Sequence, residues 1–286
     1  MNRDLLVAFV RAYPAQPATA IWRAIEVEAI RRHGLPEGLG LDVGCGDGKL
    51  TRIILGLVGR RDLVGIDPDQ LETRAARASG IYRSVHTSSA ARVPWPDASF
   101  DFALSNSVLE HIPDLGPTLA EVARVLRPGA TFVITVPTVG FHRNLQGPGR
   151  ASGNRDRYLA KLDARLAHHH YLDTPGWRAI LADHGMQLER RFGYLDRAEC
   201  QRWEWLSKMT GGLLYSLAGG QSRPIEIQRK LGLREAQNRA GWPRPVARLM
   251  AVALAAGLDA TPAYWSTREG LDDLQAGCLL IAARRN

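Results

Sequence analysis

A glycine-rich turn with an acidic residue at its start is the strongest chemical signal in this sequence of 286 residues. Residues 41–48 read Leu-Asp-Val-Gly-Cys-Gly-Asp-Gly, so an apolar segment runs directly into closely spaced glycines. Such glycines let the backbone approach a bound ligand closely. A dinucleotide-binding turn would carry a further glycine where Lys49 stands, and Asp42 would repel a pyrophosphate. The charge of Asp42 therefore favours a cationic ligand.

A second acidic residue lies at the spacing expected for a ribose-binding carboxylate. The apolar segment 64–66 ends in Asp67, which follows Gly46 by about 20 residues. A carboxylate at the end of the second strand of a βαβ unit accepts the hydroxyl groups of a ribose. Asp42 and Asp67 together predict a site for a positively charged nucleoside.

Three further segments follow in a fixed order: residues 93–101 (Val-Pro-Trp-Pro-Asp-Ala-Ser-Phe-Asp), 105–113 (Ser-Asn-Ser-Val-Leu-Glu-His-Ile-Pro) and 125–129 (Val-Leu-Arg-Pro-Gly). With the two motifs above, they make residues 39–138 resemble the class I S-adenosylmethionine (SAM) dependent methyltransferases. The resemblance lies in the broad group typified by the ubiquinone and menaquinone biosynthesis enzymes. It implies a Rossmann-like α/β fold, SAM as the cofactor and S-adenosyl-L-homocysteine as the product.

The resemblance also assigns residues to parts of the cofactor. Pro68 would pack on the adenine, and Asn106 and Ser107 would line the methionine moiety. The family's usual adenine-binding aspartate corresponds to Ser89, so Ser89 or the neighbouring backbone at Ala90 must take its place. The expected cofactor-binding residues are Asp42, Gly44, Cys45, Gly46, Asp67, Pro68, Ser89, Ala90, Asn106 and Ser107.

Few side chains are candidates for catalysis, because a sulfonium cofactor brings its own electrophile and the protein mainly aligns the reactants. His111 is the candidate general base, and the alternative is a histidine that packs at a helix start. Glu110 orients His111 or is solvated. One of the histidines at 168–170 reaches the site from a lid; no metal site is expected, because successive side chains diverge. Arg23 and Tyr13 are weaker candidates for the cofactor carboxylate.

The elements that must position these residues alternate between short apolar runs and amphipathic stretches, which is typical of a doubly wound, mostly parallel sheet. The predicted strands are residues 39–43, 62–66, 82–85, 100–105, 131–136, 186–189 and 277–283. The predicted helices are residues 18–32, 49–57, 70–78, 115–126 (ended by Arg127-Pro128-Gly129), 158–167 and 174–182, the last with Thr174 as its N-cap.

We expect one methyltransferase domain over residues 1–286 with additions around its core. The segments are 1–37 (N-terminal helical segment), 38–139 (SAM-binding core), 140–173 (candidate lid), 174–195 (sheet resumption), 196–273 (helical insertion) and 274–286 (last strand). The insertion carries the aromatic residues Trp203, Trp205, Tyr215, Trp242 and Tyr264. It forms a substrate chamber, a dimer contact, a membrane-surface patch flanked by Arg244 and Arg248, or a packed cap.

Composition sets the remaining expectations. The net charge of +8 and the pI near 9.8 permit anionic partners and identify none. Three cysteines without a C-x-x-C pair suit reduced thiols in the cytoplasm, and no apolar run is long enough to span a bilayer. We expect a small-molecule or lipid-linked acceptor, with peripheral membrane contact left open. The rivals are an RNA methyltransferase, which lacks a recognisable base-binding motif here, and a SAM-binding regulator without activity.

Overall fold

The computed structural model describes residues 2–13, 16–148, 154–212, 242–258 and 270–286. The chain divides into two compact units that alternate along the sequence. The sheet unit contains residues 29–139, 170–192 and 278–286. The helical unit lies within residues 1–28, 140–169 and 193–277, so the N-terminal segment, the candidate lid and the insertion contribute to one unit.

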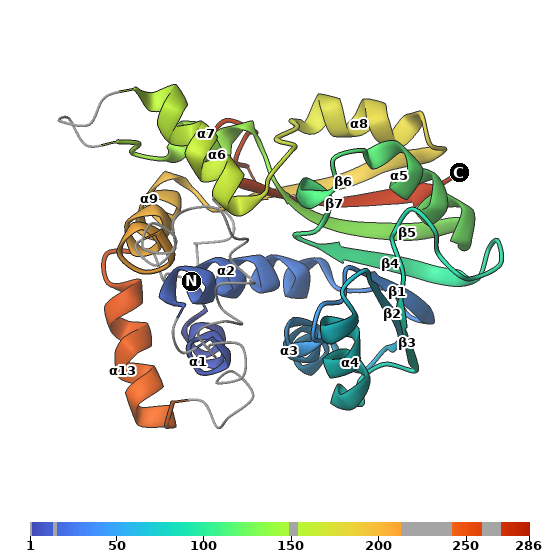
Figure 1. Ribbon diagram of the computed structural model, residues 1–286, viewed down its shortest axis with the longest axis horizontal. Helices are drawn as coiled ribbons and strands as arrows, with labels where there is room; N and C mark the ends of the chain where they lie inside the picture. Colours follow the sequence, from blue (N-terminus) through green and yellow to red (C-terminus); the bar gives the residue numbers. More distant parts are fainter. Residues whose placement is uncertain (1, 14–15, 149–153, 213–241, 259–269) are drawn as a thin grey trace. The chain divides into compact units, whose positions relative to one another are not determined.

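One mixed sheet of seven strands, formed by the described residues, confirms the predicted fold class (Figure 1). The strands are β1 (Leu39–Val43), β2 (Asp62–Asp67), β3 (Ser84–Thr87), β4 (Phe100–Asn106), β5 (Leu126–Pro137), β6 (Met186–Tyr194) and β7 (Cys278–Arg285). Their order is β3-β2-β1-β4-β5-β7-β6. The first five pair in parallel, whereas β7 runs antiparallel to β5. Strands β1 and β4 are almost wholly buried, as expected for a sheet with helices on both faces.

Helices α3 and α4 lie on one side of this sheet, and α5 and α8 lie on the other (Figure 1). Their bounds are α3 (Lys49–Val58), α4 (Gln70–Ser79), η1 (Leu109–His111), α5 (Leu115–Val125) and α8 (Thr174–Ala182). Aspartate side chains accept hydrogen bonds from the first free amides of three of these helices: Asp69 at α4, Asp114 at α5 and Asp173 at α8. Polar caps therefore set where the helices around the site begin.

The helical unit contains α1 (Arg3–Ala12), the N-terminal part of α2 (Pro17–His33), α6 (Val139–Asn144), α7 (Arg155–Leu166), α9 (Arg197–Ser207), η2 (Lys208–Gly212) and α13 (Arg244–Ala255). Trp22, Phe141 and Trp203 meet pairwise edge to face, with ring centroids 5.2–5.6 Å apart. Trp203 thus packs in a core, which agrees with the alternative that the insertion is a packed cap. Tyr215 and Tyr264 lie outside the described residues.

Several sequence-based boundaries are wrong, among them the end of β6, which extends to Tyr194 rather than to residue 189. Residues 127–129 do not end a helix: α5 stops at Val125, and these residues begin β5, where a register shift opposite Phe100 accommodates them. The third strand begins at Ser84, because Tyr82 instead turns its hydroxyl toward Asp42. The N-cap of α8 is Asp173 rather than Thr174, since the Asp173 carboxylate accepts from the Gly176 amide at 2.9 Å. Helix α1 was not predicted.

Asp173→Ala should lower the free energy of unfolding by about 1 kcal/mol, because the Gly176 amide loses its acceptor. Asp173→Asn should lower it by no more than a few tenths of that, since asparagine caps equally well. Urea unfolding followed by circular dichroism measures both changes. Equal losses for the two variants would contradict the assigned cap.

Candidate functional site

The predicted site residues of the sheet unit come together at the carboxyl ends of β1, β2, β3 and β4 (Figure 1). Strand β1 lies between β2 and β4, so the chain order of the strands reverses at this point of the sheet. Open α/β sheets bind ligands at such a switch point. The topology alone therefore places the turn after β1 where a ligand would bind.

Backbone hydrogen bonds hold the glycine turn against the end of β2. The amides of Gly44 and Cys45 both donate to the carbonyl of Ile66, at 2.8 and 2.9 Å. The amide of Gly46 donates to Oδ2 of Asp67 at 3.0 Å. The two motifs that the sequence indicated separately are thus one hydrogen-bonded unit.

Gly44 and Gly46 serve different purposes, although both have positive φ (+73° and +52°). A Cβ on Gly44 would lie 2.5 Å from the side chain of Val108, so this glycine allows the turn to pack against the segment after β4. A Cβ on Gly46 would meet only Oε2 of Glu72, at 3.9 Å. Gly46 therefore leaves its backbone open to a ligand.

Asp42 is buried behind the turn, and its Oδ2 accepts hydrogen bonds from Thr51 (2.7 Å) and Tyr82 (2.6 Å). Burial raises its pKa to about 6, against the opposing effect of these two donors. Asp42 thus links β1, α3 and the segment before β3. The Cys45 thiol is also buried, where it packs with Ala76, Val85 and Tyr82, so only the backbone of Cys45 belongs to the turn surface.

Asp67 accepts backbone hydrogen bonds from Gly46 and Asp69 (2.9 Å), while burial raises its pKa. Glu72 lies close by in the first turn of α4 and is 5% exposed. Sequence reasoning missed Glu72, although a glutamate in the first turn after Asp67 was a usable signal. Asp42, Asp67 and Glu72 form the acidic cluster: three carboxylates, two of them buried, around one turn.

The expected adenine-binding segment follows β3. Residue Thr87 pairs with Asp67, and the amide of Ser88 donates to the Asp67 carbonyl at 3.1 Å. Pro68 and Ser89 are exposed, Ala90 is half-buried, and the Ser89 hydroxyl accepts from the Ala91 amide. These residues therefore border the acidic cluster, and their contact with an adenine stays a prediction.

An arginine network holds the loop between β3 and β4, and the sequence did not indicate it. Arg124 of α5 donates to the carbonyls of Trp95 (2.9 Å) and Val93 (3.1 Å) and pairs with Glu121 at 2.8 Å. Glu121 in turn accepts from the amide of Val93 at 2.9 Å. These hydrogen bonds therefore fix the backbone at the start of the segment 93–101.

Asn106 and Ser107 lie at the carboxyl end of β4, next to the glycine turn through Val108. Asn106 is buried, and Ser107 has a φ of +50°, which is uncommon for a residue with a side chain. Its amide donates to both the carbonyl and the hydroxyl of Thr135, at 3.0 Å each. Strained backbone of this kind clusters at functional sites.

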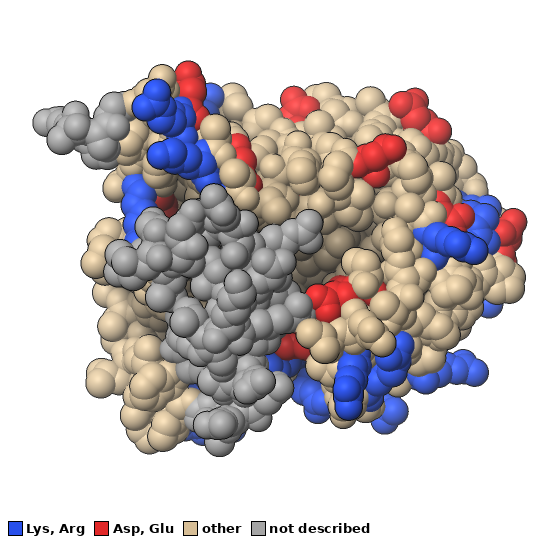
Figure 2. All heavy atoms as spheres, in the orientation of Figure 1, with Lys and Arg blue, Asp and Glu red and all other residues tan. Residues whose placement is uncertain are grey.

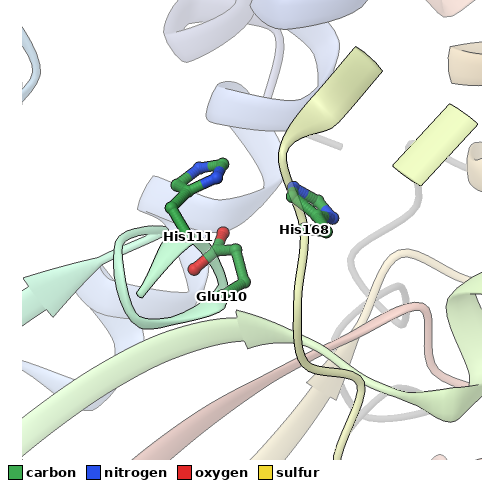
Figure 3. A group of neighbouring side chains, drawn as sticks. All are labelled: Glu110, His111 and His168. Atoms are coloured by element: carbon green, nitrogen blue, oxygen red, sulfur yellow. The ribbon is translucent and has the colours of Figure 1, made fainter. Parts of the chain in front are cut away.

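Glu110 and His111 follow on η1, as Figure 3 shows, with Glu110 buried and His111 exposed. The amide of His111 donates to the carbonyl of Val108 at 2.9 Å, which fixes this short helix. Nε2 of His170 lies 2.8 Å from the carbonyl of Ile112 and 3.1 Å from that of Pro113. His170 therefore steadies the loop after η1. His168, also labelled in Figure 3, follows α7 in the helical unit.

Arg23 and Tyr13 belong to the helical unit. Arg23 pairs with the buried Glu26, whose other oxygen accepts from the hydroxyl of Tyr194 at 3.2 Å. This buried pairing gives Arg23 a role in the interior of its own unit. Its expected contact with the cofactor stays a prediction.

Known proteins resemble this chain at the same segments. Residues 41–134 match the family model of a methyltransferase domain. A probable S-adenosylmethionine-dependent methyltransferase of Mycolicibacterium smegmatis is 33% identical over 124 residues, which are 43% of this chain and 46% of that protein. An uncharacterized methyltransferase of Mycobacterium sp. (strain KMS) is 30% identical over 186 residues, which are 60% of this chain and 70% of that protein.

A probable chloroplastic tocopherol O-methyltransferase of Oryza sativa subsp. japonica is 33% identical over 142 residues, 48% of this chain and 37% of that protein. The chain spans about half the length of the curated relatives that it matches first. The structure of a putative sarcosine dimethylglycine methyltransferase from Galdieria sulphuraria has the same fold, with a TM-score of 0.51 and 17% identity, over 93% of this chain and 84% of that one.

The fold and the site define a class I, Rossmann-like methyltransferase architecture, and the chain belongs to the class I SAM-dependent methyltransferases. The narrower likeness to the ubiquinone and menaquinone enzymes stays a prediction. The residues present fit SAM as the cofactor. The acidic cluster suits the positive charge of a sulfonium nucleoside, and the open backbone at Gly46 permits close approach.

Gly46→Ala should weaken SAM binding at least tenfold, because the added methyl group occupies the open side of the turn. Gly34→Ala is the matched control: Gly34 also has a positive φ (+80°), and a Cβ there meets no atom within 4 Å. Both variants should lose about 1 kcal/mol of stability from left-handed strain. Titration calorimetry with SAM tests the difference, and an unchanged affinity in Gly46→Ala would refute the assigned approach.

Asp42→Asn should flatten the pH dependence of stability between pH 4 and pH 6. The folded-state pKa of about 6 exceeds the ordinary value of 3.8, so the stability that Asp42 contributes is present below pH 4 and lost as pH rises through 6. The loss amounts to about 3 kcal/mol for the wild type. Urea unfolding at several pH values measures it, and parallel curves for both proteins would contradict this account.

Proposed function

We propose that this chain transfers the methyl group of SAM to an oxygen, nitrogen or carbon nucleophile of a small-molecule or lipid-linked metabolite. One observation carries the proposal. The turn that bears the acidic cluster packs through Gly44 against Val108, and Val108 directly precedes the helix η1 with His111. A cofactor site and an exposed acid–base group therefore adjoin in one unit.

SAM supplies the electrophilic methyl group, so the protein has to bind, orient and deprotonate. The acidic cluster would hold the positive nucleoside, and backbone hydrogen bonds from Gly46 and Asp69 keep Asp67 in place. His111 would accept the proton of an oxygen or nitrogen acceptor on a ring nitrogen. The methyl carbon would bond to the acceptor as its bond to sulfur breaks, and S-adenosyl-L-homocysteine would leave. A neutral amine, or a carbon nucleophile that is already deprotonated in solution, depends less on a general base.

One relative of the chain supports the proposed class of acceptor. The rice relative is named for tocopherol, a lipid-like phenol, and for transfer to oxygen. A phenol loses a proton on methylation, which suits a histidine base.

The test is incubation of the purified chain with isotope-labelled SAM and a metabolite extract of its host. Mass spectrometry should reveal a metabolite that gains one labelled methyl group. Binding of SAM without any methylated product would favour a regulatory protein instead. A Gly46→Ala sample at a SAM concentration well below its dissociation constant provides the control for unspecific methylation.

His111→Ala should lower kcat by about 10²–10⁴-fold and change the affinity for SAM by less than about threefold, because a general base acts on the acceptor. Its pH profile should also lose the acidic limb that protonation of a base produces. Stopped-assay kinetics and calorimetry give the two numbers. Equal losses of kcat and of SAM affinity would assign His111 a structural role.

Asp67→Ala should weaken SAM binding by about 1–3 kcal/mol, because ribose hydroxyl groups would lose their acceptor. Asp67→Asn keeps an acceptor for the Gly46 amide and serves as the control for the turn. Calorimetry with S-adenosyl-L-homocysteine and SAM measures both. An unchanged affinity in Asp67→Ala would place the ribose elsewhere.

An RNA acceptor is the second candidate, favoured by one surface of the sheet unit. Lys and Arg side chains gather over α3 and α4 (Figure 2), where Arg52, Arg74, Arg77 and Arg83 are exposed. Filter binding of RNA at increasing salt decides between the candidates, since phosphate contacts give a steep decline of affinity with salt. Weak binding at physiological salt would leave the small-molecule acceptor.

A further inference from the structure

Helix α13 of the helical unit presents apolar side chains to solvent. Its alanines Ala247, Ala251 and Ala255 recur every four residues, are buried, and face α1, against which the helix packs. The opposite side carries Leu249 (73% exposed) and Val252 (54% exposed). A helix of a soluble protein normally turns polar residues outward, whereas α13 turns Leu249 and Val252 outward.

An exposed tryptophan lies near each end of α13. Trp242, which is 42% exposed, precedes the first turn of α13. At the other end, Arg202 of α9 donates to the carbonyls of Leu254 and Ala256, and Trp205 follows one turn later on the same side of α9. Trp205 is 57% exposed. We call Trp205, Trp242, Val246, Leu249, Val252 and Ala253 the α13 surface.

The charged side chains of α13 itself are positive. Arg244 and Arg248 are exposed on α13, and the helix contains no acidic residue. Arg11 of α1 is exposed as well, and its Nε donates to the carbonyl of Trp242 at 3.2 Å. Three guanidinium groups thus border the apolar face near the N-terminal end of α13.

We infer that the α13 surface docks on an anionic lipid bilayer. Leucine and valine enter the boundary of the acyl chains, tryptophans prefer the headgroup level, and arginines pair with lipid phosphates. A symmetric contact with a second copy would remove Arg244 and Arg248 from water, and α13 of that copy offers no carboxylate to pair them. Charge complementarity therefore favours lipid over a second copy.

The geometry fits a helix that lies in the plane of the membrane. The 12 residues of α13 span about 18 Å, whereas crossing the hydrocarbon core needs about 20 residues. Among the described residues, no helix is long and apolar enough to cross a membrane. Docking through α13 would bring the chain to lipid-linked molecules without a spanning segment.

Sedimentation with vesicles tests this docking on the full chain. Wild type should bind phosphatidylglycerol vesicles at least tenfold better than phosphatidylcholine vesicles, and the binding should weaken with salt. The double variant Leu249→Glu, Val252→Glu should bind phosphatidylglycerol at least tenfold more weakly. Leu71→Glu is the control, because Leu71 is an exposed leucine on α4 of the sheet unit whose exposure (59%) lies between those of Val252 (54%) and Leu249 (73%). Its binding should equal that of the wild type.

Circular dichroism verifies that the double variant is folded. If it is not, the pair Arg244→Gln, Arg248→Gln provides the same test through the charge. The inference is overturned if wild type does not bind phosphatidylglycerol, or if the folded α13 variants bind as well as Leu71→Glu. A third outcome also overturns it. Sedimentation equilibrium would show that the wild type is a dimer and that the double variant is a monomer which still binds vesicles, so the α13 surface would be the contact with a second copy.

Discussion

The attachment of the glycine turn to the end of β2 is the interaction on which the site depends. Two amides of the turn share the carbonyl of Ile66, and a third donates to the carboxylate of Asp67. Backbone groups that would otherwise need water are thereby satisfied within the protein. The same bonds bring the acid of β2 beside the backbone that must meet the ligand, so shape and charge of the site arise together.

The acidic cluster carries an electrostatic cost that a cationic ligand offsets. Burial raises the pKa values of both Asp42 and Asp67, which means that the charged forms are disfavoured in the chain by itself. Thr51, Tyr82 and the backbone amides lower part of this cost. A sulfonium nucleoside would lower it further, whereas the second phosphate of a dinucleotide would add to it. The sign of the buried charge thus selects the class of cofactor.

Each of the two units has its own stabilising interactions. The sheet unit holds the residues that match other methyltransferases, and the arginine network around Arg124 keeps its loop between β3 and β4 in place. The helical unit has its own core around Trp22, Phe141 and Trp203, and its own buried charge pair between Arg23 and Glu26. It also exposes the α13 surface, which nothing in the sheet unit requires.

Local patterns determined much of this protein. Alternating apolar runs predicted all seven strands, five of them to within two residues, although β5 begins and β6 ends five residues outside the predicted bounds. The spacing of Asp42, Gly44, Gly46 and Asp67 predicted one cofactor site, because these features depend on neighbours in sequence. Other features needed the tertiary structure. Whether Arg127–Gly129 ended a helix or began a strand depended on pairing with the distant Phe100. Which segments pack together decided the burial of Glu72, the Tyr82–Asp42 hydrogen bond and the exposure of Leu249. Apolar periodicity identifies the apolar residues of a helix, but it does not identify the face that packs against another element.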